Sequence, residues 1–264
     1  MATNDAINAG LSGVTGTGNF VGSTSPTFVT PVLGTPSSGN LVNCTGTHGL
    51  INIQVFKTSG TYTPTANMAH CVIQCLGGGG AGGGTPTASA SSAAAGCGGG
   101  AGGFSQSYVT SATIGASQTV TIGSGGTGVS NGAGNNGGDT SVGSIVIGKG
   151  GTGGIAGSAL TTSNIANPGA GSVGGVAGTG DLTFVGGSGG SAIFIVAGGI
   201  NSGKGGDSVF ASGAIQVSSN NAAGNSAAAN TGAGGSGSTV YGITGVNEAG
   251  GAGGSGLVII YEYS

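Results

Sequence analysis

Apolar residues in this chain occur in short runs, and long glycine-rich tracts separate the runs. Val, Ile, Thr, Tyr and Phe are frequent in the runs, and these residue types favour strands over helices. No segment shows the apolar spacing of about 3.6 residues that an amphipathic helix needs. We therefore predict an all-β fold. The predicted strands cover residues 51–56, 71–76, 107–110, 119–122, 144–147, 193–196, 215–218 and 257–261.

The last predicted strand is apolar on both faces. Leu257, Ile259 and Tyr261 alternate with Val258 and Ile260. Because successive side chains of a strand point to opposite faces, both faces of this strand need a covering layer. We expect it to lie between two layers or at a subunit interface.

Glycine supplies 67 of the 264 residues, and only 3% of the residues are charged. Each glycine costs roughly 0.5–1 kcal/mol of extra backbone entropy in a regular element. A folded chain tolerates so many only where a side chain does not fit, so we predict polyglycine-II-like tracts packed against each other; hairpin loops are the alternative. A disordered chain is normally charged and poor in apolar residues, unlike this one. The tracts cover residues 77–84, 96–103, 123–138, 148–154, 169–180, 186–190, 203–206, 232–237 and 250–256.

The segment before Leu50 has a different composition. It is rich in Thr, and Pro26, Pro31 and Pro36 recur every five residues. Such an extended segment cannot bury itself alone, so it is a linker or a stem wound with copies of itself. We predict an extended stem over residues 1–50, followed by a glycine-rich β-sandwich domain over residues 51–264.

Charge and cysteine content exclude several classes of protein. The three lysines are scattered, whereas nucleic-acid binding needs clustered cations. No apolar run is long enough to span a membrane, and the first residues lack the pattern of a signal peptide. Cys71 and Cys75 lie in one predicted strand, about 13 Å apart, whereas a disulfide needs about 4.4–6.8 Å. We expect buried free thiols, which fits assembly in a reducing cytoplasm.

Enzyme and metal motifs occur here only as fragments. Residues 198–204 resemble a phosphate-binding loop, but glycines follow where Ser or Thr and a helix are needed. Residues 186–190 fit a nucleophile elbow, again without a helix. His48 and His70 match no zinc-finger spacing with the cysteines. We expect no catalytic residue, cofactor or metal.

A weak internal repeat links two glycine pairs. Asp139 follows one pair and Asp207 follows another, and each precedes a strand-like run. An aspartate in this position typically accepts hydrogen bonds from nearby backbone amides. A calcium site would need six to eight oxygen ligands, which two isolated aspartates do not supply.

Three segments resemble parts of phage tail fibres with a C-terminal glycine-rich domain. Residues 53–64, with the strand and polyglycine burst of residues 71–84, resemble the opening of that domain. Residues 250–263 resemble its last strand, and the Ser-Pro-Thr-rich residues 22–39 resemble fibre-shaft repeats. The resemblance implies a homotrimeric fibre in the virion, assembled in the host cytoplasm and bound to other tail or fibre proteins. It also implies a tip that contacts a host polysaccharide or outer-membrane protein.

The predicted function is non-enzymatic receptor binding by segments held between the glycine tracts. These segments cover residues 85–95, 160–167, 192–196, 218–231 and 238–247. A structural fibre without a specific ligand is the main alternative, followed by an enzyme and an ice-binding protein. Core packing is the competing interpretation for the aromatic candidates. The candidate contact residues are Leu160, Phe194, Ile195, Asn221 and Tyr241.

Overall fold

The computed structural model describes residues 49–161, 170–195, 199–242 and 246–264. Residues 46–264 form one compact unit, and the predicted stem lies outside the described residues except for its last two. In the described part, strands and extended segments make up nearly everything, and α2 (Ser111–Ile114) is a single helical turn. The predicted all-β fold is confirmed.

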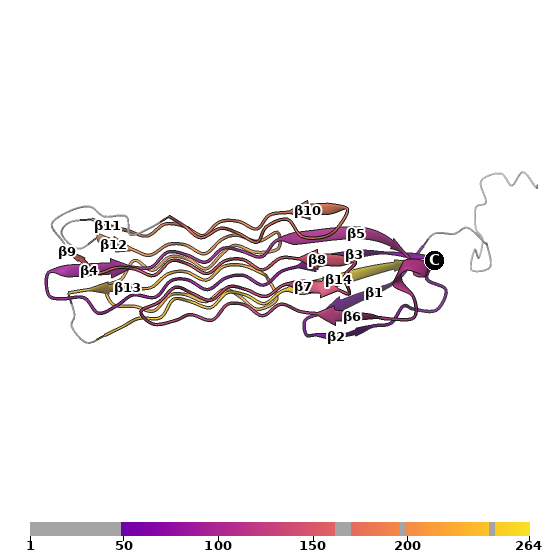
Figure 1. Cartoon of the computed structure of the whole chain (residues 1–264), viewed down its shortest axis with the longest axis horizontal. Coiled ribbons are helices and arrows are strands. Elements are labelled where there is room, and N and C mark those ends of the chain that lie inside the picture. The colour runs from indigo at the N-terminus through magenta and orange to yellow at the C-terminus, as the bar shows by residue number, and fades with distance from the viewer. Residues whose placement is uncertain (1–48, 162–169, 196–198, 243–245) are drawn as a thin grey trace, which may run out of the picture. The chain divides into compact units, whose positions relative to one another are not determined.

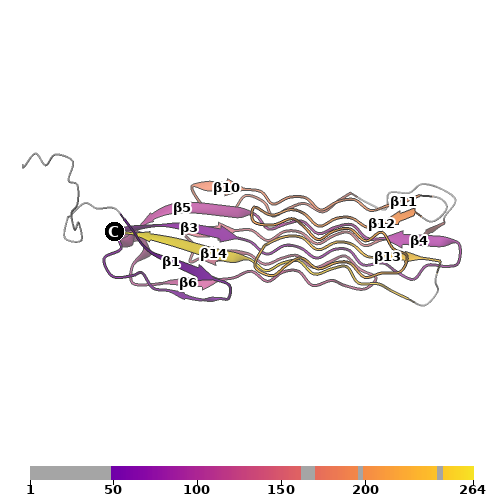
Figure 2. The same ribbon diagram turned by 180° about the vertical axis from the view of Figure 1, so that it is seen from behind.

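A five-stranded antiparallel sheet occupies the end of the unit where the C-terminus lies, which we call the base (Figure 1). Figure 2 shows its strands side by side, with the last strand of the chain between the first strand and the central one. In spatial order they are β1 (Leu50–Phe56), β14 (Leu257–Tyr263), β3 (His70–Leu76), β5 (Phe104–Thr110) and β10 (Leu182–Phe184).

A four-stranded antiparallel sheet packs on one face of the five-stranded sheet. Alternate residues of β3 and β14 point into the space between them, as the period-two pattern requires. The base is therefore a small β-sandwich. The second sheet contains, in spatial order, β2 (Gly60–Tyr62), β6 (Gln118–Thr121), β7 (Thr140–Val142) and β8 (Val146–Gly148).

The sandwich core contains two of the cysteines. Cys71 and Cys75 are fully buried and free, as the sequence predicts, and Cys97 is buried elsewhere. Burial raises the pKa of Cys71 to about 11 and that of Cys75 to about 12, so both stay protonated at neutral pH. Ile73, Val258 and Ile260 complete the buried face of the larger sheet.

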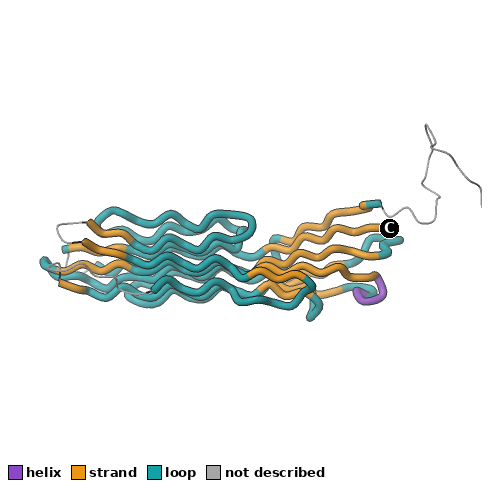
Figure 3. The backbone as a smooth tube through the Cα atoms, turned by 90° about the horizontal axis from the view of Figure 1, so that it is seen from above, coloured by secondary structure: helices purple, strands orange, loops and turns teal. Residues whose placement is uncertain are grey.

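Beyond the base, glycine tracts run side by side as wavy segments without strand pairing, shown in teal in Figure 3. Residues 77–84 lie among six other segments. Their N–H groups donate in turn to three neighbours: Gly80 to Gly100, Ala81 to Asn135 and Gly82 to Gly251, at 2.8–3.0 Å. The pattern repeats every third residue, as in a polyproline-II-type helix with three residues per turn. The predicted packed tracts are confirmed, and the alternative of hairpin loops is wrong.

Close backbone approach explains why these tracts are glycine. A Cβ atom added to Gly80 would overlap the carbonyl group of Thr152, and similar backbone clashes meet most glycines of the bundle. Where a methyl group does fit, alanine occurs: Ala81 and Ala101 are fully buried. Side chains return on the outer tracts, where buried Gly151 and Gly154 alternate with outward-facing residues.

At the far end of the bundle, which we call the tip, the chain forms short strands again (Figures 1 and 3). A three-stranded sheet and a separate two-stranded hairpin enclose a small core of alanines, Cys97, Phe194 and Ile200. The sheet contains β13 (Thr239–Tyr241), β4 (Ser92–Ala95) and β9 (Leu160–Thr161), and the hairpin contains β11 (Ile193–Ile195) and β12 (Gly199–Asn201).

One predicted strand is wrong. Residues 215–218 belong to an outer extended tract, in which Ala214 and Val217 are buried and the residues between them are exposed. Ala214 N–H donates to Gly234 O, and Val217 O accepts from Ser202 N–H. Their burial follows the threefold period of the bundle and not the twofold period of a sheet.

A buried carboxylate joins the last strand to the turn after β2. Glu262 is fully buried and accepts hydrogen bonds from Thr65 Oγ at 2.6 Å, Thr65 N at 2.9 Å and Tyr62 Oη at 2.8 Å. Gln54 Nε2 donates to it from 3.3 Å. Burial opposes ionisation of Glu262, but these hydrogen bonds outweigh it and lower the pKa below its usual value. The charge is thus held by dipoles and not by a cation.

Gly80→Ala tests the close packing of the bundle. We expect it to destabilise the fold by about 1–3 kcal/mol, because overpacking forces the backbone apart. For a domain of this size that corresponds to a fall in the melting temperature of roughly 2–12 °C. Gly60→Ala is the matched control, since open space surrounds Gly60. Equal melting temperatures for the two variants in a calorimetric scan would contradict the packing argument.

Acid titration tests the Glu262 network. A carboxyl group with a lowered folded-state pKa stabilises the protein above its unfolded-state pKa, and this contribution is lost as pH falls through the folded-state pKa. The unfolding free energy of the wild type should therefore fall below about pH 4.3. Glu262→Gln should start about 1–3 kcal/mol lower at neutral pH, since its amide cannot accept every bond, and should fall less in acid. Parallel urea titrations from pH 7 to pH 3 measure both slopes, and equal slopes would exclude this role.

Candidate functional site

The tip brings most of the sequence-predicted contact residues together. Ala93 of β4 pairs with Tyr241 of β13 on one side and with Leu160 of β9 on the other. Directly paired residues share a face of a sheet, so Leu160 and Tyr241 flank Ala93 on the same face. Leu160 is 36% exposed, and Tyr241 is half-buried against the tip core.

Phe194 is buried, whereas a residue that contacts a receptor must be exposed. Phe194 is 2% exposed and packs with Ala93, Ala95 and Ile200 in the tip core. Core packing, the competing interpretation from the sequence, describes this side chain. Ile195, the next residue, ends β11 opposite Gly199.

Asn221 acts on the backbone of the tip sheet. Its Oδ1 accepts a hydrogen bond from Tyr241 N at 2.8 Å, which holds β13 in place. Its φ of 56° lies in the left-handed region, which asparagine tolerates better than most residues. Asn221 therefore positions Tyr241, an assignment that sequence reasoning did not make.

An open hollow of about 440 Å³ lies against β4 and β9 on the sheet face opposite to Leu160, because Ala159 and Thr161 line it and Leu160 does not. The Ser89 and Ser92 hydroxyls bond each other at 3.1 Å, and Thr87 N donates to Asn247 Oδ1 at 2.8 Å. The lining carries hydroxyl and methyl groups and no charge. Its residues are Thr87, Ala88, Ser89, Ser92, Ala159 and Thr161.

Some of the segments that the sequence predicts to be exposed at the tip instead form strands or lie along the bundle. Residues 92–95 belong to the first segment predicted to contact a receptor, but they form β4 and are buried. Their side chains therefore form part of the tip core and are not available for contact. Residues 224–227 return along the bundle, where Gly224 N donates to Ala249 O and Ala227 N to Ala252 O. The exposed part of the tip is therefore smaller than the sequence suggests.

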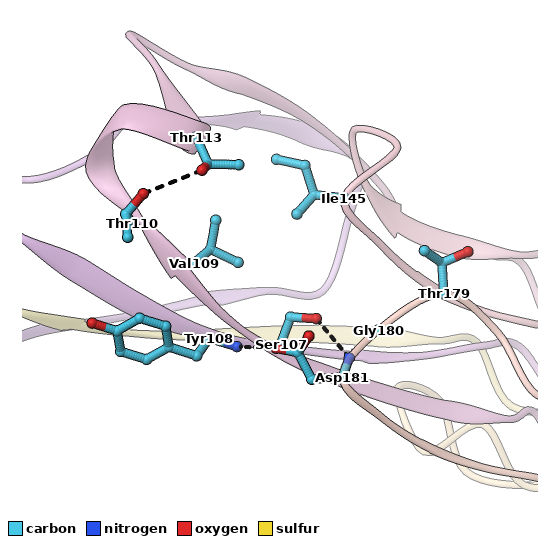
Figure 4. Close-up of a pocket in the computed structure, with 9 residues that line it drawn as sticks. All are labelled: Ser107, Tyr108, Val109, Thr110, Thr113, Ile145, Thr179, Gly180 and Asp181. Carbon is cyan, nitrogen blue, oxygen red and sulfur yellow. Dashed lines mark hydrogen bonds between the residues drawn. The ribbon is translucent and has the colours of Figure 1, made fainter.

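A second hollow, of about 390 Å³, lies at the base between β5, α2 and the turn before β10 (Figure 4). Asp181 is its one carboxylate. Asp181 Oδ2 accepts from Tyr108 N at 2.9 Å, and Asp181 N donates to Ser107 Oγ at 3.0 Å. These bonds assign Asp181 to anchoring the turn against β5, and the hollow offers no second acid with which it could share a proton.

The two repeated aspartates have structural partners. Asp139 Oδ1 accepts from Gly150 N at 2.9 Å, and Asp207 Oδ1 accepts from Gly213 N at 2.6 Å, which confirms the predicted amide bonds. Each also pairs with a lysine, Lys149 and Lys204 respectively. For Asp139, burial opposes ionisation, but the bonds from Lys149 and Gly150 outweigh it and lower the pKa.

Metal-site geometry does not occur among the residues described: no three His, Cys, Asp or Glu side chains gather there. His70 instead stacks on Tyr263, with ring centres 5.1 Å apart, and lies 4.8 Å from the ring of Tyr108. In the same part of the chain, no helix has the length and apolarity needed to cross a bilayer.

Comparison with known families gives one match. The model of a glycine-rich domain matches residues 55–263, which include the base, the bundle and the tip. No curated protein matches the chain.

Asn221→Ala tests the positioning of the tip sheet. Loss of the acceptor and strain at a positive φ should lower the unfolding free energy by about 1–3 kcal/mol. The amide of Tyr241 should exchange hydrogen faster as well. Asn221→Asp keeps an acceptor oxygen and serves as the control. The exchange rate of the Tyr241 amide is measured by NMR. The same rate in Asn221→Ala and in the wild type would refute the assignment.

Proposed function

Since this chain belongs to the glycine-rich domain family, we propose that it is a phage tail-fibre adhesin that presents its tip to a receptor on the host cell. The receptor-binding step is non-enzymatic, and the receptor is a surface polysaccharide or an outer-membrane protein. The protein belongs to the virion, acts as a homotrimer and joins other tail or fibre proteins.

The observation that carries the proposal is the separation of the tip from the base by the glycine bundle. The bundle is stiff because its backbone groups are bonded to each other in several directions. Recognition residues in proteins are commonly placed on short segments held by such a scaffold. At the tip, where the glycine tracts end, the chain again contains Ser, Thr, Asn, apolar and aromatic side chains that could contact a ligand.

The chemistry of the tip indicates how binding works. Glu248 is the one charged residue in the described tip segments 85–95, 158–161, 190–195, 199–202, 218–222, 238–242 and 246–248. Contact therefore depends on shape, apolar area and hydrogen bonds from the Ser and Thr hydroxyls. Without charged groups, long-range attraction contributes little to the association rate. Binding should consequently change little with salt, and several copies in one fibre supply avidity.

Leu160 and Tyr241 are the residues that we propose to contact the receptor. Asn221 supports Tyr241, and Phe194 supports the core beneath it. The hydroxyl-lined hollow on the other face of β9 supplies hydrogen-bonding groups that match either a sugar or a peptide backbone.

Binding of the labelled full chain to host cells tests this function. Leu160→Ala and Tyr241→Ala should each weaken binding about tenfold, a loss of about 1.4 kcal/mol. Ile215→Ala is the matched control, because Ile215 is 74% exposed on the bundle away from the tip. Hosts lacking the polysaccharide or single outer-membrane proteins identify the receptor class. Equal binding to all hosts and by all variants would instead favour a structural fibre without a specific ligand.

A further inference from the structure

The five-stranded sheet at the base has one face that no described residue covers as a layer. The opposite face packs on the four-stranded sheet. Cross-strand register places Ile53, Tyr261, Val72 and Tyr108 in one row across β1, β14, β3 and β5. We call the uncovered side, seen in Figure 2 as the array from β1 to β10, the outer sheet face.

Two further rows extend the outer sheet face. Each row lists residues that are paired from strand to neighbouring strand. They are Val55, Ile259, Gln74, Gln106 and Leu182, and then Leu257, Leu76, Phe104 and Phe184.

This face is apolar and aromatic, and its first two rows are the open part, because Leu76 and Phe104 of the third row are already buried. Val55 is 51% exposed, Tyr108 58% and Phe184 50%. Phe210 lies edge-on to Phe104 at 5.9 Å between ring centres and continues the apolar surface beyond the strands. The two glutamines in the middle bond each other at 2.8 Å, so their amides are partly satisfied within the face. No row contains a charged side chain, because Glu262 points into the sandwich.

The flat area of the face is about half of what each partner contributes to a standard interface. Four strands of seven residues, each about 23 Å long and about 4.8 Å apart, span roughly 440 Å² before side-chain relief is counted. β10 and Phe210 add to this. The largest apolar patch on a typical monomer is about 300–600 Å², and a standard interface uses about 800 Å² from each partner.

We propose that copies of this chain pack against each other through the outer sheet face. An uncharged face meets its own copy without like-charge repulsion, and it lacks the charge pattern that would select a charged partner. β1 lies at the edge of the sheet, where exposed strands attract further pairing. β1 also begins at Leu50, the last residue of the stem that the sequence predicts to wind with copies of itself.

This inference rests on the proposed function only for the presence of several copies in one fibre. The outer sheet face and the receptor-contact residues lie at opposite ends of the bundle. A variant that disturbs one can therefore leave the other intact, and the two proposals fail separately.

The experiment measures mass and surface exposure of the full chain together. Light scattering gives the mass in solution, and hydroxyl-radical footprinting gives the reactivity of Tyr108 and Ile53 relative to Ile215. Val55→Lys places a charge in the middle row of the face, on its edge strand β1. Ile215→Lys is the control, because it adds the same charge at a more exposed apolar position outside the face.

We expect the wild type at a multiple of 23.9 kDa, with Tyr108 and Ile53 less reactive than their exposure in one chain implies. Val55→Lys should raise the concentration for half-dissociation about tenfold or more, as loss of about 1.4 kcal/mol does. If residues 1–48 keep the copies joined, Val55→Lys should still restore the reactivity of Tyr108. Ile215→Lys should change neither quantity.

Three results would overturn the proposal. The first is a wild-type mass of 23.9 kDa with Tyr108 and Ile53 reactive, which means that the chain is a monomer with an open face. The second is the same mass with both residues protected, which means that another part of the same chain covers the face. The third is a wild-type assembly of several copies in which Tyr108 is as reactive as in Val55→Lys, because the copies then associate through another surface. Binding of Val55→Lys to host cells, measured alongside, reports separately on the tip.

Discussion

The sideways hydrogen bond between neighbouring main chains, repeated every third residue, is the interaction on which this structure depends. Residues 77–84 and 96–103 bond to each other through Gly80 and Gly83, and each also bonds to several further tracts. At most positions of the interior these bonds leave no room for a Cβ atom between the backbones, and a methyl group fits only at positions such as Ala81 and Ala101. The same constraint removes side chains from the bundle interior, so little apolar burial is available there. Apolar cores therefore form at the two ends, and this divides the unit into base, bundle and tip.

The sequence predicts the base well because its long strands are runs of apolar, mostly β-branched and aromatic residues of ordinary strand length. Cys71 to Leu76 and Leu257 to Tyr261 follow the period of two and form the centre of the larger sheet. The short strands β4 and β7 were missed, since three or four residues of Ala, Ser, Thr and Val carry no period of their own. The false strand at residues 215–218 has the opposite cause. Its β-branched residues suit any extended backbone, and only the burial of every third residue distinguishes an outer tract from a sheet.

The tip was located from the sequence by a simple argument: residues between glycine tracts must lie at the ends of the bundle. That argument found Leu160 and Tyr241, which the register of β4 then places on one face. It could not tell an exposed side chain from a core one. Phe194 and Leu160 look alike in the sequence, yet Phe194 fills the space left by the small alanines of β4. The positive φ of Asn221 and its bond to Tyr241 are equally invisible without coordinates.

The bundle also separates the base from the tip energetically. A tract of eight residues at about 3.1 Å per residue spans about 25 Å. Substitutions farther apart than about 7–10 Å usually have additive effects on stability. Changes at the tip core around Phe194 and Ile200 should therefore not reach the sandwich core around Ile73 and Ile260. The tip sequence is free to change while the base keeps its packing, because the tracts between them contain almost no side chains through which strain could pass.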